Sequence, residues 1–225
     1  MSDRRSSTDR ESPVGEPVVR ADADLFEEEA VPFDPDDPES LADAAETVRA
    51  FAVEPHVADA KYVLRGAAAC AALVRGEGGY RAAVERAGEA VSVSFVRKWA
   101  RVHDLPYAVR RHVACGDVPP TAAKHVARVQ GRARYLLAWA VVDAGMTVRE
   151  VRDAASAVAD GTAAEAALRE HGVDPGTIEV DLPVDLYVEL RRRAALSGER
   201  TDDLVAAALR GRFDGHQDRS DASRR

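Results

Sequence analysis

The chain has 225 residues, of which 46% are hydrophobic and only 5% aromatic, and its formal net charge is −8. This length allows one large domain or two small ones, with a core built mainly from small apolar side chains on helices. The N-terminus is polar from Ser2 onward and no run of 18 residues is apolar, so the sequence predicts a cytoplasmic protein without signal peptide or membrane span. Cys70 and Cys115 fit no metal or redox spacing, and we expect reduced thiols, no metal site and no cofactor.

The charge is distributed unevenly along the chain. Residues 1–60 carry five basic and seventeen acidic side chains, whereas residues 61–135 carry fourteen basic and five acidic ones. Residues 136–225 are acidic again, with twelve basic and seventeen acidic side chains. Such asymmetry indicates a module that faces nucleic acid, flanked by acidic segments.

Residues 1–38 are acidic, contain several prolines and show no sustained periodicity. They lack the apolar surface needed to offset chain entropy, so we expect a disordered tail. One interpretation is a tail that keeps the protein in solution; the other is a segment that competes with DNA for basic residues.

The predicted order begins at Ser40, a suitable N-cap for a helix over 41–53, and a second helix follows over 57–76. The run "GEGGY" at 76–80 has no lysine followed by serine or threonine, so we expect a turn there and no phosphate-binding loop. A short helix over 80–87 then ends at Gly88, which favours a helix C-terminus.

The segment "SVSFVRKWARVHDLP" (92–106) predicts a helix with two chemically different faces, capped by Ser92 or Ser94. Phe95, Trp99 and Val102 fall on one face at helical spacing and should be core. Ser94, Arg97, Lys98 and Arg101 fall on the other. A short helix, a turn and a helix with a basic front predict a helix-turn-helix. The alternative is an ordinary amphipathic helix with a solvated basic face.

Further helices are expected in the stretches 106–116, 119–129, 132–145 and 147–161, which complete an all-α bundle over 39–160. His125 and Arg134 add to the positive charge near the predicted DNA face. The residues expected to hold the DNA backbone are Arg81, Arg86, Lys124, Arg128 and Arg132. Residues 161–176 are rich in small side chains and predict a short helix and a hinge.

From about 62 to 158 the sequence resembles the helix-turn-helix domain of ParB/KorB-type partition proteins. The matching phrases are "SVSFVRKWARVHDLPYAVRRHVACGDVPPTAAKHV" (92–126) and "DAGMTVREVRDAA" (143–155). The resemblance implies that the helix after Ser92 reads the major groove. Thr121-Ala122-Ala123-Lys124 stands where the family often has Gly-His-Ala-Arg, and no nucleotide-binding signature precedes the bundle, so we expect no nucleotide-dependent clamp. The acid-rich, lysine-poor composition also resembles that of haloarchaeal proteins, although a GC-rich genome would likewise favour arginine.

The segment 177–213 has a different pattern. Ile178, Val180 and Leu182 alternate as in a half-buried strand, and two helices follow. Strand–helix–helix in so few residues resembles the ribbon-helix-helix fold of CopG- and Arc-like proteins, which implies an intertwined homodimer. Its expected dimerisation residues are Ile178, Val180, Leu182, Leu186, Leu190, Leu204 and Leu209. The outward positions Glu179 and Asp181 would be repelled by phosphate, so this module is expected to dimerise without binding DNA. Residues 214–225 are expected to be a disordered tail.

Together these patterns predict a mainly α, homodimeric protein that binds double-stranded DNA and acts in DNA partitioning or transcription regulation. Whether a partition ATPase or another protein is a partner stays open. The alternative function is a protein-interaction adaptor with a degenerate helix-turn-helix. No Ser/His/Asp order, metal-ligand cluster or phosphate loop is found, so an enzyme is not expected.

Overall fold

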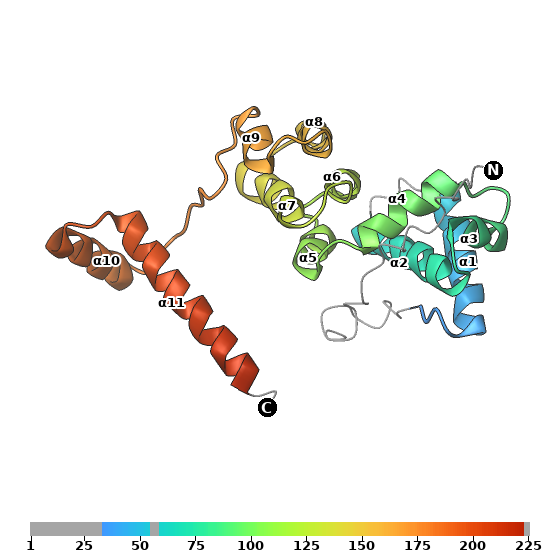
Figure 1. Ribbon diagram of the computed structural model, residues 1–225, viewed down its shortest axis with the longest axis horizontal. Coiled ribbons are helices and arrows are strands. Elements are labelled where there is room, and N and C mark those ends of the chain that lie inside the picture. The colour runs from blue at the N-terminus through green and yellow to red at the C-terminus, as the bar shows by residue number, and fades with distance from the viewer. Residues whose placement is uncertain (1–32, 55–58, 223–225) are drawn as a thin grey trace, which may run out of the picture. The chain divides into compact units, whose positions relative to one another are not determined.

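The computed structural model describes residues 33–54 and 59–222, and among them it contains helices but no strand (Figure 1). The helices are α1 (Pro38–Val53), α2 (Ala60–Gly76), α3 (Tyr80–Ala87), α4 (Val93–His103), α5 (Tyr107–Cys115), α6 (Pro120–Val126), α7 (Arg132–Ala144), α8 (Val148–Ala159), α9 (Ala164–Arg169), α10 (Val184–Ser197) and α11 (Thr201–Ala222). The predicted mainly α class is therefore confirmed. The chain divides into two compact units, Met1–Thr177 and Ile178–Arg225.

Helix α1 begins two residues before the predicted cap. Asp37 is the N-cap, and its carboxylate accepts hydrogen bonds from the amides of Glu39 (3.1 Å) and Ser40 (3.3 Å). Ser40 instead accepts a hydrogen bond from the Asp34 amide (2.8 Å). The prediction of Ser40 as the cap was wrong because Pro38 fits the first turn, where no amide is needed, and the carboxylate of Asp37 satisfies two free amides. The rest of the predicted acidic tail, residues 1–32, lies outside the described residues.

An aromatic cluster joins α1, α2 and α4. The ring of Phe51 lies 5.6 Å from Tyr62, 5.3 Å from Phe95 and 4.9 Å from Trp99, measured between centroids. Trp99 is only 4% exposed, so its predicted place in the core is confirmed. Helices α1 and α2 approach closely where α2 has Gly66, because a Cβ there would overlap the Phe51 ring. The cluster fixes the back of α4 against the bundle.

Helices α5 to α9 extend the same bundle. Gly116 and Gly145 end α5 and α7 in the left-handed conformation, with φ of 87° and 65°. A capping box starts α8: the Glu150 amide donates to Thr147 Oγ1, and the Glu150 carboxylate accepts from the Thr147 amide (2.7 Å). The short helix expected within 161–176 is α9, and its Ala164, Ala167 and Leu168 are buried in the bundle.

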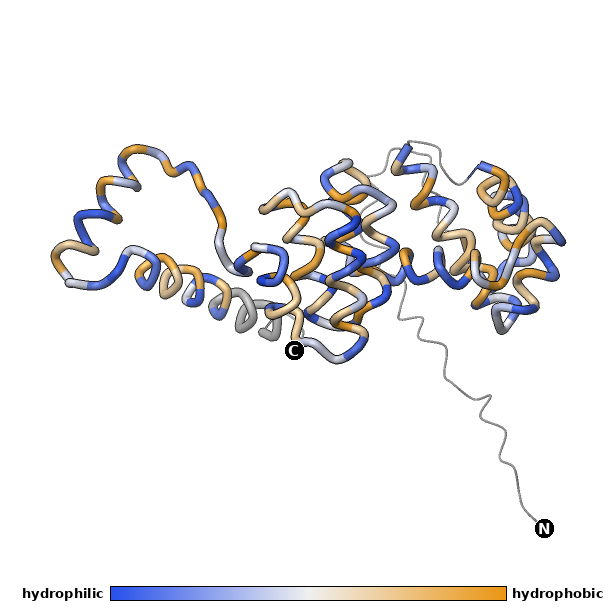
Figure 2. Tube along the Cα trace, turned by 90° about the horizontal axis from the view of Figure 1, so that it is seen from above, coloured by the Kyte–Doolittle hydropathy of each residue, from blue (hydrophilic) through white to orange (hydrophobic). Residues whose placement is uncertain are grey.

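The second unit contains α10 and α11, and it differs from the ribbon-helix-helix prediction at its start. Residues 177–183 form no strand, because a β-strand needs a second strand for its backbone hydrogen bonds and a single chain supplies none here. Hydrophobic residues alternate with hydrophilic ones along this segment and recur along both helices (Figure 2). Residues 214–222, expected as a tail, continue α11, since no proline interrupts the run.

Candidate nucleic-acid interface

Helices α3 and α4 are joined by a short turn, residues 88–92. Gly88 follows α3 with a φ of 104°, a conformation that favours glycine. Ser92 is the N-cap of α4, and its Oγ accepts a hydrogen bond from the Phe95 amide at 3.1 Å. Of the two predicted caps, Ser92 is therefore the one used, which leaves Ser94 on the first turn of α4 with its Oγ 3.0 Å from that of Ser92.

Helix α4 has a buried back and an exposed front. Val96, Trp99, Ala100 and Val102 are buried and Phe95 is half-buried. All four predicted base-reading residues are exposed, and we call them the α4 basic face: Ser94, Arg97, Lys98 and Arg101. The structure thus brings these four side chains together on one side of one helix.

Two cations of the α4 basic face lie over aromatic rings. The Arg97 guanidinium carbon is 5.2 Å from the centroid of the Tyr80 ring, and Lys98 Nζ is 5.0 Å from that of Trp99 and 5.4 Å from that of Phe95. Cation–π attraction restricts the conformations of both side chains. Tyr80 was missed by sequence reasoning, since its contact with Arg97 depends on how α3 packs against α4.

A second set of basic side chains surrounds His125, and we call it the α6 basic group: Lys124, Arg128 and Arg152. Burial lowers the pKa of His125, and the nearby charges of Lys124, Arg128 and Arg152 lower it further. Burial also lowers the pKa of Lys98, with a further contribution from repulsion by Lys124. Helices α4 and α6 pack against each other, so the α6 basic group adjoins the α4 basic face and extends its positive field.

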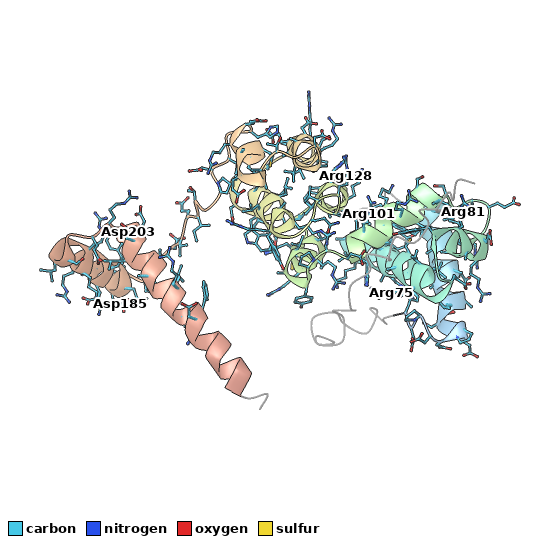
Figure 3. The ribbon with its side chains drawn as sticks, in the orientation of Figure 1. Arg75, Arg81, Arg101, Arg128, Asp185 and Asp203 are labelled. Carbon is cyan, nitrogen blue, oxygen red and sulfur yellow. The ribbon has the colours of Figure 1, made fainter. Side chains whose placement is uncertain are left out.

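The predicted backbone contacts are not all equivalent. Lys124 and Arg128 belong to the α6 basic group, whereas Arg81 lies on α3 well apart from Arg101 and Arg128 (Figure 3). Two of the predicted residues make surface ion pairs: Arg86 Nε is 3.7 Å from Glu77, and Arg132 Nη2 is 3.5 Å from Glu165. Such exposed pairs are weak and exchange readily for another anion.

A polar cluster that the sequence did not reveal lies behind the end of α4. Burial raises the pKa of Asp104, and four arginines oppose that rise: Arg75, Arg134, Arg110 and Arg101. Arg110 is only 9% exposed. Beside them His103 is half-buried, and desolvation lowers its pKa to about 3. The separations between these residues along the chain carry no periodic signal, so only folding brings them together.

Arg134, expected to add charge near the DNA face, is instead half-buried at this cluster. Its Nη1 donates to the carbonyl oxygen of Asp104 at 2.9 Å, and its Nε donates to that of Val129 at 2.8 Å. Its guanidinium is therefore hydrogen-bonded to the protein backbone and is not part of the exposed basic surface.

Both cysteines are free in the described part of the chain. Cys70 is buried and Cys115 exposed, and burial raises the pKa of the Cys70 thiol to about 12. Within residues 33–54 and 59–222, no group of three or more His, Cys, Asp or Glu side chains could hold a metal ion. Across the same residues, no helix combines the length and apolarity required to cross a bilayer.

The predicted dimerisation residues lie on the surface of the second unit. Ile178 is 62% exposed and Val180 60%, and Leu182, Leu186 and Leu209 are also exposed. Leu190 and Leu204 are half-buried. Most of the residues expected to form a dimer core are thus uncovered in the single chain.

Comparison with known proteins identifies a family without assigning a function. No curated protein and no solved structure matches the chain. A family model matches residues 34–173, which hold α1 to α9 and end before the second unit. The match covers more than half of the chain, which therefore belongs to DUF7119, a family of unknown function.

Proposed function

We propose that this protein binds double-stranded DNA and that α4 is its recognition helix, lying in the major groove. The observation that carries the proposal is the α4 basic face: three cations and a serine exposed along one side of a helix whose other side is anchored in the core. The α3–turn–α4 arrangement and the resemblance to ParB/KorB-type domains support the same assignment.

Arg97, Lys98 and Arg101 suit guanine edges, because arginine and lysine donate hydrogen bonds to O6 and N7. Ser94 suits a phosphate near the start of the helix. The α6 basic group, together with Arg81, Arg86 and Arg132, would hold the backbone. Arg86 and Arg132 would exchange a carboxylate for a phosphate when DNA binds.

The proposal includes a homodimer formed by the second unit. Its exposed apolar side chains require a partner surface, and two copies of segment 177–182 paired antiparallel would bury Ile178, Val180 and Leu182 together. This is the ribbon-helix-helix arrangement expected from the sequence. A two-fold dimer would recognise an inverted-repeat DNA site.

The direct test is selection of bound duplexes from a random-sequence pool, followed by fluorescence anisotropy on the selected site. Arg97→Ala and Arg101→Ala should each weaken binding by ~1–3 kcal/mol and relax the preference at one base pair. Arg169→Ala is the matched control, because Arg169 is an exposed arginine on α9 that pairs with Asp174. Unchanged affinity in both α4 variants would refute the assignment of α4.

A second candidate function is a protein-interaction adaptor, which the exposed apolar side chains of the second unit favour. In that case α4 would be a degenerate recognition helix, and the selection would yield no preferred sequence. If a site is selected, mapping bound positions across the genome would distinguish the two proposed roles. A few clustered sites near an origin would favour partitioning, and scattered promoter sites would favour transcription regulation.

A further inference from the structure

Arg134 lies on the first turn of α7 and contacts the ends of two other segments. Asp104, whose carbonyl oxygen accepts from Nη1 at 2.9 Å, is the residue directly after α4. Val129, whose carbonyl oxygen accepts from Nε at 2.8 Å, follows the end of α6. One guanidinium therefore joins the end of the helix that carries the α4 basic face to the end of the segment that carries Lys124 and Arg128.

The chemistry of this contact requires arginine. Carbonyls near a helix C-terminus lack a partner within their own helix and carry the negative end of the helix dipole. The Asp104 carbonyl is such a group at the C-cap of α4, whereas Val129 lies in the turn three residues after α6. A planar guanidinium directs separate N–H groups at these two carbonyl oxygens in fixed directions, whereas a lysine ammonium is a point charge on a flexible stem. A lysine would keep the charge but would not fix the angle between the two segments.

The two segments that Arg134 joins repel each other electrostatically. Lys124 is near enough to Lys98 to lower the pKa of Lys98, and Arg101 is a further positive charge near Arg134 itself. The carboxylate of Asp104 offsets part of this repulsion. Core packing brings the two segments together, and the hydrogen bonds of Arg134 add a directional connection between them.

We propose that Arg134 is a positioning residue that holds the α4 basic face and the α6 basic group together as one continuous DNA-binding surface. Its effect on DNA binding rests on the proposed function, but its effect on the geometry of the bundle does not. Arg134 itself would touch no DNA, since both of its hydrogen bonds are directed into the protein.

The effect of Arg134 on the geometry of the bundle is tested without DNA. Spin labels are attached at Ser94→Cys on α4 and Thr121→Cys on α6, two exposed positions, and the distance between the labels is measured. Cys115→Ser removes the exposed thiol, and buried Cys70 does not compete for the label. We expect a narrow distance distribution in the otherwise unchanged chain and a shifted or broadened one in Arg134→Lys and Arg134→Gln. The matched control is Arg169→Lys, which breaks a surface contact between Arg169 Nε and Asp174 (3.2 Å) and should leave the distribution unchanged.

The measurements are made well below each variant's melting temperature, so a general loss of stability would not mimic the effect. Unchanged distributions in both Arg134 variants would overturn the proposal. If neither variant folds, NMR measurement of hydrogen exchange with solvent at the Arg134 Nε–H in the unsubstituted protein tests the proposal instead. Slow exchange supports the hydrogen bond to Val129, and exchange as fast as in exposed arginines overturns it.

The role of Arg134 in DNA binding is tested by the salt dependence of DNA affinity, since the slope of that dependence reports how many phosphates are contacted. Arg134→Lys keeps the net charge, yet it should weaken binding on the order of tenfold and reduce the slope, because one of the two basic groups moves off the backbone. An affinity and slope equal to those of Arg169→Lys would refute the role in DNA binding. If the unsubstituted chain binds no DNA, the proposed function fails, while the distance measurement still decides whether Arg134 positions α4.

Discussion

The α1–α9 bundle buries most of its large apolar side chains, whereas the C-terminal unit leaves most of its own exposed. In the bundle the large side chains from Phe51 to Leu168 are packed in one core, and Trp99 ties α4 to it. In the C-terminal unit Ala194 is the only buried hydrophobic residue among the described side chains, and Phe213 is 64% exposed. The bundle therefore has a complete core within one chain, whereas the C-terminal unit leaves most of its large apolar side chains exposed.

The largest expected effect is the loss of the aromatic anchor of α4. Trp99→Ala should lower the free energy of unfolding of the bundle by ~3–5 kcal/mol, because it leaves a cavity beside Phe51 and Phe95. Urea denaturation followed by circular dichroism measures this. Leu196→Ala in the C-terminal unit is the control, since Leu196 is exposed in the single chain and its loss should leave the free energy of unfolding of the bundle nearly unchanged. Equal effects of the two substitutions would break the contrast between the units.

The next effect is a pH dependence of the bundle that arises from His103. Burial holds its pKa at about 3 in the folded bundle, whereas in the unfolded chain it takes up a proton below its ordinary value of 6.5. The unfolded state therefore binds more protons between pH 6.5 and pH 3, and stability falls as the pH falls through that window, by up to ~1.4 kcal/mol per pH unit. His103→Gln should flatten this part of the stability–pH curve. Parallel curves for the two proteins would contradict a half-buried, neutral His103.

A charge in the C-terminal unit should affect assembly rather than folding of the bundle. Val180→Asp would place a carboxylate where two copies of segment 177–182 are proposed to meet, which should weaken the dimer by ~1–3 kcal/mol, or about 5- to 150-fold. Sedimentation equilibrium measures the dimer constant, and the melting temperature of the bundle should not change. Val53→Asp is the control, because Val53 is an exposed side chain of the bundle. A dimer that tolerates Val180→Asp would place the interface elsewhere.

The smallest effect concerns the capping box at the start of α8. Thr147→Ala should reduce stability by ~1 kcal/mol, and Thr147→Ser should restore most of it. Hydrogen bonds from Thr147 hold the pKa of Glu150 below its ordinary 4.5. Their contribution is therefore present above pH 4.5 and is lost as the pH falls through the lowered pKa. Thermal melts of both variants at pH 7 and at low pH test this, and an equal loss at both pH values would contradict it.

Local patterns in the sequence predicted the elements that depend on nearby residues. The buried and exposed faces of α4 were predicted correctly from the spacing of Trp99 and Val102 relative to Arg97 and Arg101. The helical period alone determines which residues share a face, so no knowledge of tertiary packing is needed. The sequence did not predict the contacts that depend on tertiary packing: Tyr80 under Arg97, the burial of Asp104, and the hydrogen bonds of Arg134. These join residues up to 30 positions apart in unrelated helices. The strand predicted over 177–182 is absent, because no other segment of the described chain pairs with it to supply backbone hydrogen bonds.

The measurement that tests DNA binding most directly is the salt dependence of affinity for a selected duplex, measured on the full chain. If the α6 basic group, Arg81, Arg86 and Arg132 contact phosphates as proposed, the logarithm of the binding constant should fall linearly with the logarithm of salt concentration, with a slope of about −0.9 per phosphate. Arg128→Ala should make that slope shallower, because Arg128 is an exposed member of the α6 basic group. A binding constant that is independent of salt, or a chain that binds no duplex even at low salt, would contradict the account.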